Sequence, residues 1–172
     1  IGAGITTRSY YVMLKFAASI ALSTTILLSP TPAFASGKVV SNDLGKCKSG
    51  AGPAVLINVS GIKESNGTMR VQNYRGTSSE WLKTGAWLYR VEAPAKTGNM
   101  QFCLPVPSAG TYAVAIRHDI NANGKTDIFG DGGGMSNNPS INIFNLGKPS
   151  YKKTAFNVGN DVKSINISMK YR

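Results

Sequence analysis

The chain has 172 residues, of which 19 are Lys or Arg and 8 are Asp or Glu, so its formal net charge at pH 7 is +11. Lys152 and Lys153 are the only adjacent basic residues, which is well short of the run of basic residues typical of nucleic-acid-binding proteins, so we expect no nucleic-acid partner. The positive surplus favours contact with anionic surfaces, such as acidic lipids, polyanionic glycans or acidic faces of proteins. The alternative is a soluble protein whose lysines are simply scattered over its surface.

The first 35 residues have the pattern of a secretory signal peptide. From Met13 the sequence MLKFAASIALSTTILLSPTPAFA has a lysine, an apolar stretch, two prolines and a final Ala-Phe-Ala. These are the three parts of a cleavable export signal, so we predict a true start at Met13 and cleavage after Ala35. The apolar stretch is shorter than the roughly 20 residues that a spanning helix needs. We therefore expect a periplasmic or extracellular protein without a membrane span, and a retained membrane anchor is the alternative.

Residues 36–53 are predicted to be an N-terminal lead-in, and residues 54–172 a single domain. The lead-in contains Cys47, and the other cysteine of the chain is Cys103. One pair of cysteines in an exported protein predicts a disulfide, which would restrict the unfolded chain by roughly 4 kcal/mol. A redox role needs a closer pair and a metal site needs further ligands nearby, so we interpret this bond as structural.

Apolar and polar residues alternate with a period of two through most of the predicted domain, which indicates β-strands. In chain order the predicted strands are residues 54–62, 68–74, 86–93, 99–106, 111–117, 153–158 and 163–171. The last of them places Ile165, Ile167, Met169 and Tyr171 on one face. A helical pattern is limited to one turn in residues 78–85. We predict an all-β fold, a single antiparallel β-sandwich of about seven strands, immunoglobulin-like or transthyretin-like, with one disulfide.

The stretch HDINANGKTD, from His118 to Asp127, follows a predicted strand and has the oxygen spacing of an EF-hand-type calcium loop. Position 1 is Asp119, and Gly124 supplies the sharp turn. Position 12 is Gly130 instead of a bidentate glutamate, with Asp131 beside it as a substitute. We predict weak Ca²⁺ binding, at about 0.1 to 1 mM. The ligands would be the side chains of Asp119, Asn121, Asn123, Asp127 and Asp131, and the backbone carbonyl of Lys125.

The same stretch has a second interpretation without a metal ion. Asn-Gly is a favoured hairpin turn, and Asn and Asp side chains commonly hydrogen-bond the backbone of their own loop. The residue pattern leaves the calcium site and the self-capped turn as open alternatives.

Two other features carry weaker chemical signals. His118 is the single histidine of the chain, and a Ser-His-Asp arrangement with Ser136 or Ser140 would lack a nucleophile elbow. We therefore expect a hydrogen-bonded structural histidine. The segment GDGGGMSNNP, residues 130–139, lacks the G-K-S/T ending of a phosphate-binding loop, and we expect a mobile surface loop there.

Four segments of the chain form a recognisable set: GTYAVAIRHDINANGKTD, GGGMSNNP, KPSYKKTAFNV and INISMKY. Together they resemble the bacterial secreted family catalogued as domain of unknown function 2141, over a range from about Ala54 to the C-terminus. The family motif falls on His118, Asp119, Asn121, Asn123, Gly124, Asp127, Ser136, Asn137 and Asn138. Met135 and the pair Lys152-Lys153 depart from the pattern, which has an aromatic residue and acidic residues there. The resemblance implies an exported β-sandwich and brings no established activity.

These observations predict a non-catalytic exported module that binds a partner or has a structural role in the cell envelope. An envelope glycan or protein is the expected partner, and Ca²⁺ is the one expected cofactor. The alternatives are an accessory subunit without a small ligand and a hydrolase acting on an envelope polymer. Paired carboxylates of raised pKa in a concave site would indicate the hydrolase.

Overall fold

The computed structural model describes residues 1, 2, 4, 37–141 and 147–172. The chain divides into two units, Ile1–Pro32 and Ala33–Arg172. The predicted signal peptide, from Met13 to Ala35, lies outside the described residues. Among the residues that are described, no helix is long and apolar enough to cross a membrane.

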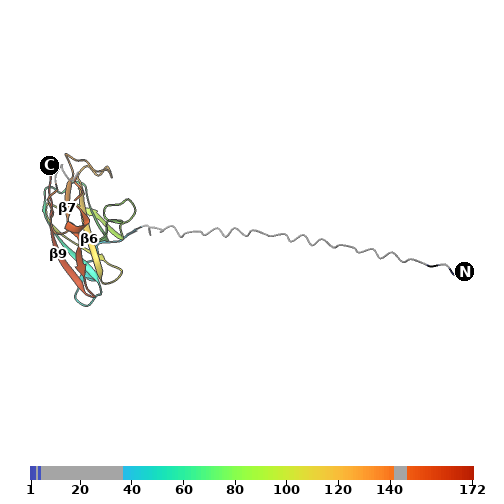
Figure 1. Ribbon diagram of the computed structural model, residues 1–172. Helices are drawn as coiled ribbons and strands as arrows, with labels where there is room; N and C mark the ends of the chain where they lie inside the picture. Colours follow the sequence, from blue (N-terminus) through green and yellow to red (C-terminus); the bar gives the residue numbers. More distant parts are fainter. Residues whose placement is uncertain (3, 5–36, 142–146) are drawn as a thin grey trace. The chain divides into compact units, whose positions relative to one another are not determined.

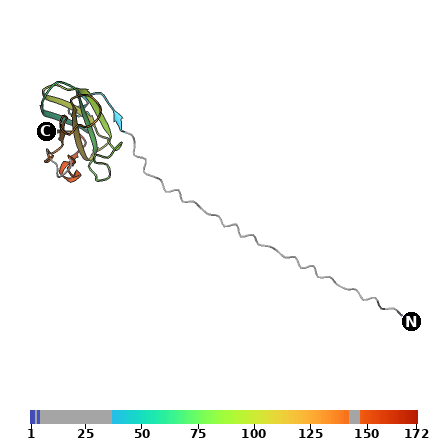
Figure 2. The same cartoon turned by 90° about the horizontal axis from the view of Figure 1, so that it is seen from above.

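The described part of the second unit contains nine strands and two one-turn helices. The strands are β1 (Lys38–Val39), β2 (Ala54–Ile62), β3 (Thr68–Arg75), β4 (Tyr89–Pro94), β5 (Gly98–Pro105), β6 (Gly110–Asp119), β7 (Gly132–Met135), β8 (Phe156–Val158) and β9 (Val162–Ser168). The helices are the 3-10 helix η1 (Leu44–Cys47) and the α-helix α1 (Tyr151–Thr154). The larger sheet has the order β1-β4-β3-β6-β7 with β8 also paired to β6, and the smaller sheet has the order β5-β2-β9. Figures 1 and 2 show the strands of this unit from two directions.

The core lies between the two sheets because each strand places alternate side chains on its inner face. From the larger sheet it receives residues such as Val71 and Val114, and from the smaller sheet residues such as Ile57 and Phe102, all fully buried. Each such side chain contributes roughly 1.5 to 3 kcal/mol when it is withdrawn from water. The all-β prediction is confirmed, and the strand predicted at residues 54–62 coincides with β2.

The prediction of an antiparallel sandwich of seven strands is wrong in two respects. Strand β9 pairs with β2 in parallel, as β1 does with β4, so both sheets are mixed. Strands β1 and β7 were not predicted, β1 because it has only two residues and β7 because it is mostly glycine. Parallel pairing of β9 with β2 is possible because the paired residues are 108 positions apart in the chain, which leaves ample length for the crossover connection that parallel strands need.

The predicted mobile loop at residues 130–139 is also wrong, because residues 132–135 form strand β7 on the edge of β6. Glycine is required here for close packing. A Cβ atom on Gly134 would lie 2.8 Å from Cγ2 of Ile167, and one on Gly132 would overlap the ring of Tyr171. Figure 1 shows β7 near β6 and β9. Lys170 and Gly133 exchange two backbone hydrogen bonds, of 2.8 and 2.9 Å, so the chain after β9 closes this edge of the sandwich.

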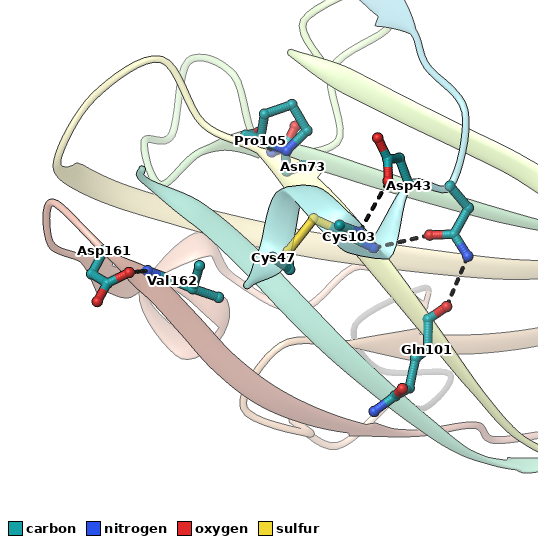
Figure 3. Close-up of a disulfide and its surroundings, with 10 residues drawn as sticks. Asp43, Cys47, Asn73, Gln101, Cys103, Pro105, Asp161 and Val162 are labelled. Atoms are coloured by element: carbon teal, nitrogen blue, oxygen red, sulfur yellow. Dashed lines mark hydrogen bonds between the residues drawn. A yellow bond between two sulfur atoms is a disulfide. The ribbon is translucent and has the colours of Figure 1, made fainter. Parts of the chain in front are cut away.

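The predicted disulfide is confirmed and attaches the lead-in to the smaller sheet (Figure 3). Cys47 in η1 is bonded to Cys103 in β5, 56 residues later in the chain. Asn42 reinforces the attachment, because its side-chain nitrogen donates to the Gln101 carbonyl at 2.9 Å and its oxygen accepts from the Cys103 backbone N–H at 3.0 Å. Residues 37–53 are therefore joined to both sheets, to the larger one through β1.

Candidate ligand-binding site

The loop that carries the predicted calcium ligands leaves the larger sheet at the end of β6. Asp119 is buried there, and its two carboxylate oxygens accept the backbone N–H groups of Asn123 at 3.1 Å and Gly124 at 2.9 Å. The Arg117 guanidinium also donates to Asp119, through Nη2 at 3.1 Å. Asp119 thus folds the loop back onto the strand end and neutralises part of the charge of Arg117.

The second half of the loop is held by two other carboxylates. Asp127 Oδ2 accepts from the side-chain amides of Asn121 and Asn123, both at 2.8 Å. Asp131, which is buried, accepts the backbone N–H of Ile120 at 3.2 Å and that of Asp127 at 3.0 Å. Lys125, whose carbonyl was a predicted ligand, donates its N–H to the Asn123 side chain at 2.7 Å.

These contacts are those of the self-capped turn. A calcium ion would have to replace the amide donors at Asp127 and compete with the Arg117 guanidinium for Asp119. Within residues 37–141 and 147–172, no three His, Cys, Asp or Glu side chains lie close enough together to hold a metal ion. Calcium binding by the six predicted ligand residues of the loop stays a prediction.

His118 is fully buried beside the core, and both of its ring nitrogens are used. Nε2 lies 2.7 Å from the Asn66 carbonyl, which can only accept, so Nε2 donates and Nδ1 accepts from the Tyr171 hydroxyl at 2.8 Å. The Tyr171 oxygen in turn accepts the Lys63 backbone N–H at 3.1 Å. This network joins three segments of the sandwich, which is a structural role.

The motif residues Ser136, Asn137 and Asn138 also hold chain segments together. The Ser136 hydroxyl accepts the Val114 N–H at 3.0 Å and donates to the Thr154 carbonyl at 2.6 Å. Asn137 donates to the Ala155 carbonyl, and Asn138 donates to the Asn166 carbonyl and accepts from the Ser168 N–H. These three side chains therefore fasten β7 to the end of α1 and to β9.

A different set of residues gathers on the outer face of the larger sheet. Alternation places Arg70 of β3, Arg90 of β4 and Arg117 of β6 on the face opposite to the core. The strand register sets Arg70 directly opposite Arg117 on one side and opposite Glu92 on the other. Three guanidinium groups thus meet on three adjacent strands.

The three arginines differ in how their hydrogen-bond donors are used. Arg70 Nε donates to Glu92 at 2.7 Å, and Arg117 uses its terminal nitrogens on Thr126, Gly124 and Asp119. Arg90 lies over the Trp87 ring, 4.1 Å from its centroid, and its nearest carboxylate oxygen is on Glu92 at 3.6 Å. Among the described residues, the buried Nε atoms of Arg90 and Arg117 have no hydrogen-bond partner.

The charges on this face affect one another. Burial lowers the pKa of the Arg90 guanidinium, and the positive charges of Arg70 and Arg117 lower it further, while Glu92 and Tyr74 act in the opposite direction. Burial raises the pKa of Tyr74 on the same face, against the opposing effect of Arg90 and Arg70. An anion placed here would relieve the mutual repulsion of the arginines.

The arginines line a cleft of about 850 Å³ on the outer face. Its walls include the loop after β6 and the turns before β4. In these turns, Trp81 packs edge-on against Tyr74 and donates its indole N–H to the Pro149 carbonyl at 2.8 Å. Residues 78–85, predicted as one helical turn, form a series of hydrogen-bonded turns and no helix. The Trp81 N–H donates to the Thr77 carbonyl with the spacing of an α-helical hydrogen bond. Seven lining residues are cationic, namely Arg70, Lys83, Arg90, Arg117, Lys148, Lys170 and Arg172, and two are acidic, Asp127 and Asp131.

Sequence reasoning missed this cleft, although part of the signal was present. Alternation within each predicted strand could have placed Arg70, Arg90 and Arg117 on the faces away from the core. What it could not supply was the register that brings the three together, since register depends on pairing between distant strands.

Comparison with protein families matches residues 57–166 to the family described as "Uncharacterized protein conserved in bacteria (DUF2141)". No curated protein and no solved structure matches the chain. Export, which the resemblance implied, stays a prediction. The match extends over more than half of the chain and includes all of β3 to β8 with most of β2 and β9. The chain therefore belongs to this family of bacterial proteins.

Proposed function

We propose that the protein is an exported, non-catalytic binding module whose cleft on the larger sheet holds an anionic ligand of the cell envelope. The observation that carries the proposal is the meeting of Arg70, Arg90 and Arg117 on adjacent strands. Like charges directly opposite each other destabilise a sheet. An anion bound against the three arginines would offset their mutual repulsion, which makes this arrangement favourable in the bound protein.

Arginine also suits the proposed ligand chemically. Its planar guanidinium matches the geometry of a carboxylate or phosphate group and can donate two parallel hydrogen bonds to it. Arg90 is held in place by its stacking on Trp87, and no described residue accepts a hydrogen bond from its guanidinium within normal distance. Its terminal nitrogens are thus positioned for an anion, whereas its Nε is buried.

Binding is favoured over catalysis because the side chains that could act as nucleophile, acid or base are engaged in structural hydrogen bonds. His118 and Ser136 are fully buried, and their polar side-chain atoms form hydrogen bonds that hold the sandwich together. The carboxylates of the loop after β6 cap backbone and amide N–H groups. Export is supported by the Cys47–Cys103 disulfide, since such bonds persist in oxidising compartments.

Titration calorimetry with two soluble probes, inorganic pyrophosphate and trigalacturonate, tests the proposal with phosphate and carboxylate chemistry. The protein would be the compact unit 33–172, which contains all the described strands and the disulfide. Substituting Arg70→Gln and Arg90→Gln together is expected to weaken binding by at least about tenfold. The matched control, Lys48→Gln with Lys163→Gln, removes two exposed charges elsewhere. Equal loss in both variants, or no binding of either probe to the wild type, would overturn the proposal.

A further inference from the structure

We infer that the anionic ligand of the cleft is the phosphate headgroup of a phospholipid, and that the loop tip Ile128-Phe129 inserts into the membrane surface beside it. The inference rests on the proposed function, because it names the ligand of the same cleft. Ile128 is 62% exposed and Phe129 is 88% exposed, and both line the cleft that contains the arginines. Apolar side chains and cations therefore face solvent at one place on the molecule.

The tip is presented on a braced loop. The Asp127 carbonyl accepts the N–H groups of Gly130 at 3.2 Å and Asp131 at 2.9 Å, which closes a tight turn around the tip. The Asp131 carboxylate accepts the backbone N–H of Ile120, at the start of the loop, and that of Asp127, just before the tip. Arg117 Nη1 donates to the Thr126 hydroxyl at 2.8 Å. Because the loop is already ordered, insertion of Ile128 and Phe129 would require little further loss of conformational freedom.

The charge around the tip complements an anionic lipid surface. The lining of the cleft has seven cationic residues against two acidic ones, and both acidic side chains already accept hydrogen bonds within the loop. Each cation near an anionic leaflet strengthens binding by roughly fivefold. Aromatic and aliphatic side chains flanked by Lys and Arg are the composition of interfacial membrane-binding surfaces.

A protein partner fits these observations less well. A stable protein interface buries about 800 Å² on each partner and has an apolar core from which charged residues are depleted. Here Ile128 and Phe129 are the lining residues whose large apolar side chains are mostly exposed, others such as Leu82 and Trp87 are only partly exposed, and seven cationic residues line the same cleft. Two apolar side chains and several cations are sufficient at a membrane surface, where the bilayer supplies the remaining apolar contact.

Vesicle flotation of unit 33–172 tests the inference, with phosphatidylcholine vesicles compared with vesicles that also contain phosphatidylglycerol. This unit is used because the predicted signal peptide would itself bind lipid. We expect binding only to the phosphatidylglycerol vesicles. The double variants Ile128→Ser with Phe129→Ser, and Arg70→Gln with Arg90→Gln, should each reduce binding by at least about tenfold.

Two control variants match these changes elsewhere on the unit. Val39→Ser with Leu44→Ser removes apolar side chains that are 60% and 42% exposed on the lead-in, and Lys48→Gln with Lys163→Gln removes two exposed charges. Both should bind within about twofold of wild type if the cleft and its tip are responsible. A Phe129→Trp variant should show a blue shift of its fluorescence on phosphatidylglycerol vesicles, since the side chain enters an apolar environment.

The outcomes separate this inference from the proposed function. Full vesicle binding by the tip variant, or unshifted emission from Phe129→Trp, would overturn membrane insertion. Absence of vesicle binding, while pyrophosphate or trigalacturonate still binds in an arginine-dependent way, would overturn the lipid ligand and leave the proposed function standing. Binding of neither vesicles nor soluble probes would overturn both.

Discussion

Arg70 on β3 and Arg117 on β6 are paired directly across two antiparallel strands, with both side chains on the outer face of the larger sheet. Glu92 offsets the charge of Arg70 from one side, and Asp119 offsets that of Arg117 from the other. Arg90 lies next to this pair and shares the Glu92 carboxylate with Arg70, at 3.6 Å against 2.7 Å. The three arginines therefore share two carboxylates, and this part of the sheet has an excess of positive charge.

The first prediction is that anions stabilise the fold through these arginines. Pyrophosphate at about ten times its dissociation constant should add roughly 1.4 kcal/mol to the free energy of unfolding, because it binds only the folded state. This corresponds to a rise in Tm of about 3 to 5 °C over sodium chloride at the same ionic strength. Differential scanning calorimetry should show the rise in the wild type and in Lys48→Gln with Lys163→Gln. It should disappear in Arg70→Gln with Arg90→Gln, and its persistence there would place the anion elsewhere.

The second prediction concerns the glycines of β7. Gly134→Ala should lower the free energy of unfolding by about 1 to 3 kcal/mol, because its Cβ would press on Ile167 and Met169 in a packed core. Gly133→Ala is the matched control, since nothing lies within 4 Å of the Cβ it would gain. Neither glycine has a positive φ, so alanine is compatible with both backbones. Urea unfolding measures the difference, and equal effects of the two substitutions would contradict the packing role.

The third prediction is a loss of stability at alkaline pH that depends on Tyr74. Burial raises the pKa of this phenol above its ordinary value of 10.0. As the pH rises past about 10, Tyr74 ionises in the unfolded chain but keeps its proton in the folded one, so the unfolded state is favoured. One such group adds a slope of at most about 1.4 kcal/mol per pH unit.

Tyr74→Phe should therefore have nearly the wild-type stability at neutral pH and a shallower decline above about pH 10. Urea unfolding across this range gives both curves. Tyr171, whose pKa burial also raises, leaves a residual slope in the variant. Parallel curves for wild type and Tyr74→Phe would contradict the assignment.

The fourth prediction separates the two interpretations of the loop after β6. If its oxygens bind Ca²⁺, millimolar calcium should raise Tm with a midpoint of about 0.1 to 1 mM, and magnesium should have a smaller effect. A variant with Asp119→Ala and Asp127→Ala should lose this response. It should also be less stable without calcium, because Asp119 and Asp127 accept hydrogen bonds from the loop. A wild-type Tm that does not change with calcium selects the self-capped loop.

The strands and the disulfide could be predicted from the sequence because their signals are local. Alternation over β2, β3 and β6 reports directly which side chains face the core, and two cysteines leave a single intramolecular pairing. Strand β7 gave no such signal, since three of its four residues are glycine and carry no side chain to alternate. Its existence depends on the packing of Ile167, Met169 and Tyr171, which lie more than thirty residues later.

The candidate site also has one part that could be predicted from local sequence and one part that could not. The sequence by itself determined that a polar loop containing Asp127 and Asp131 follows the strand that is β6, because carboxylate and amide side chains cap backbone groups within a few residues of themselves. Only the tertiary structure decided that Arg70, Arg90 and Arg117 meet in one cleft beside Phe129. The physical reason is that strand register is a property of distant segments packed together, and one step of register would send these side chains to the opposite face.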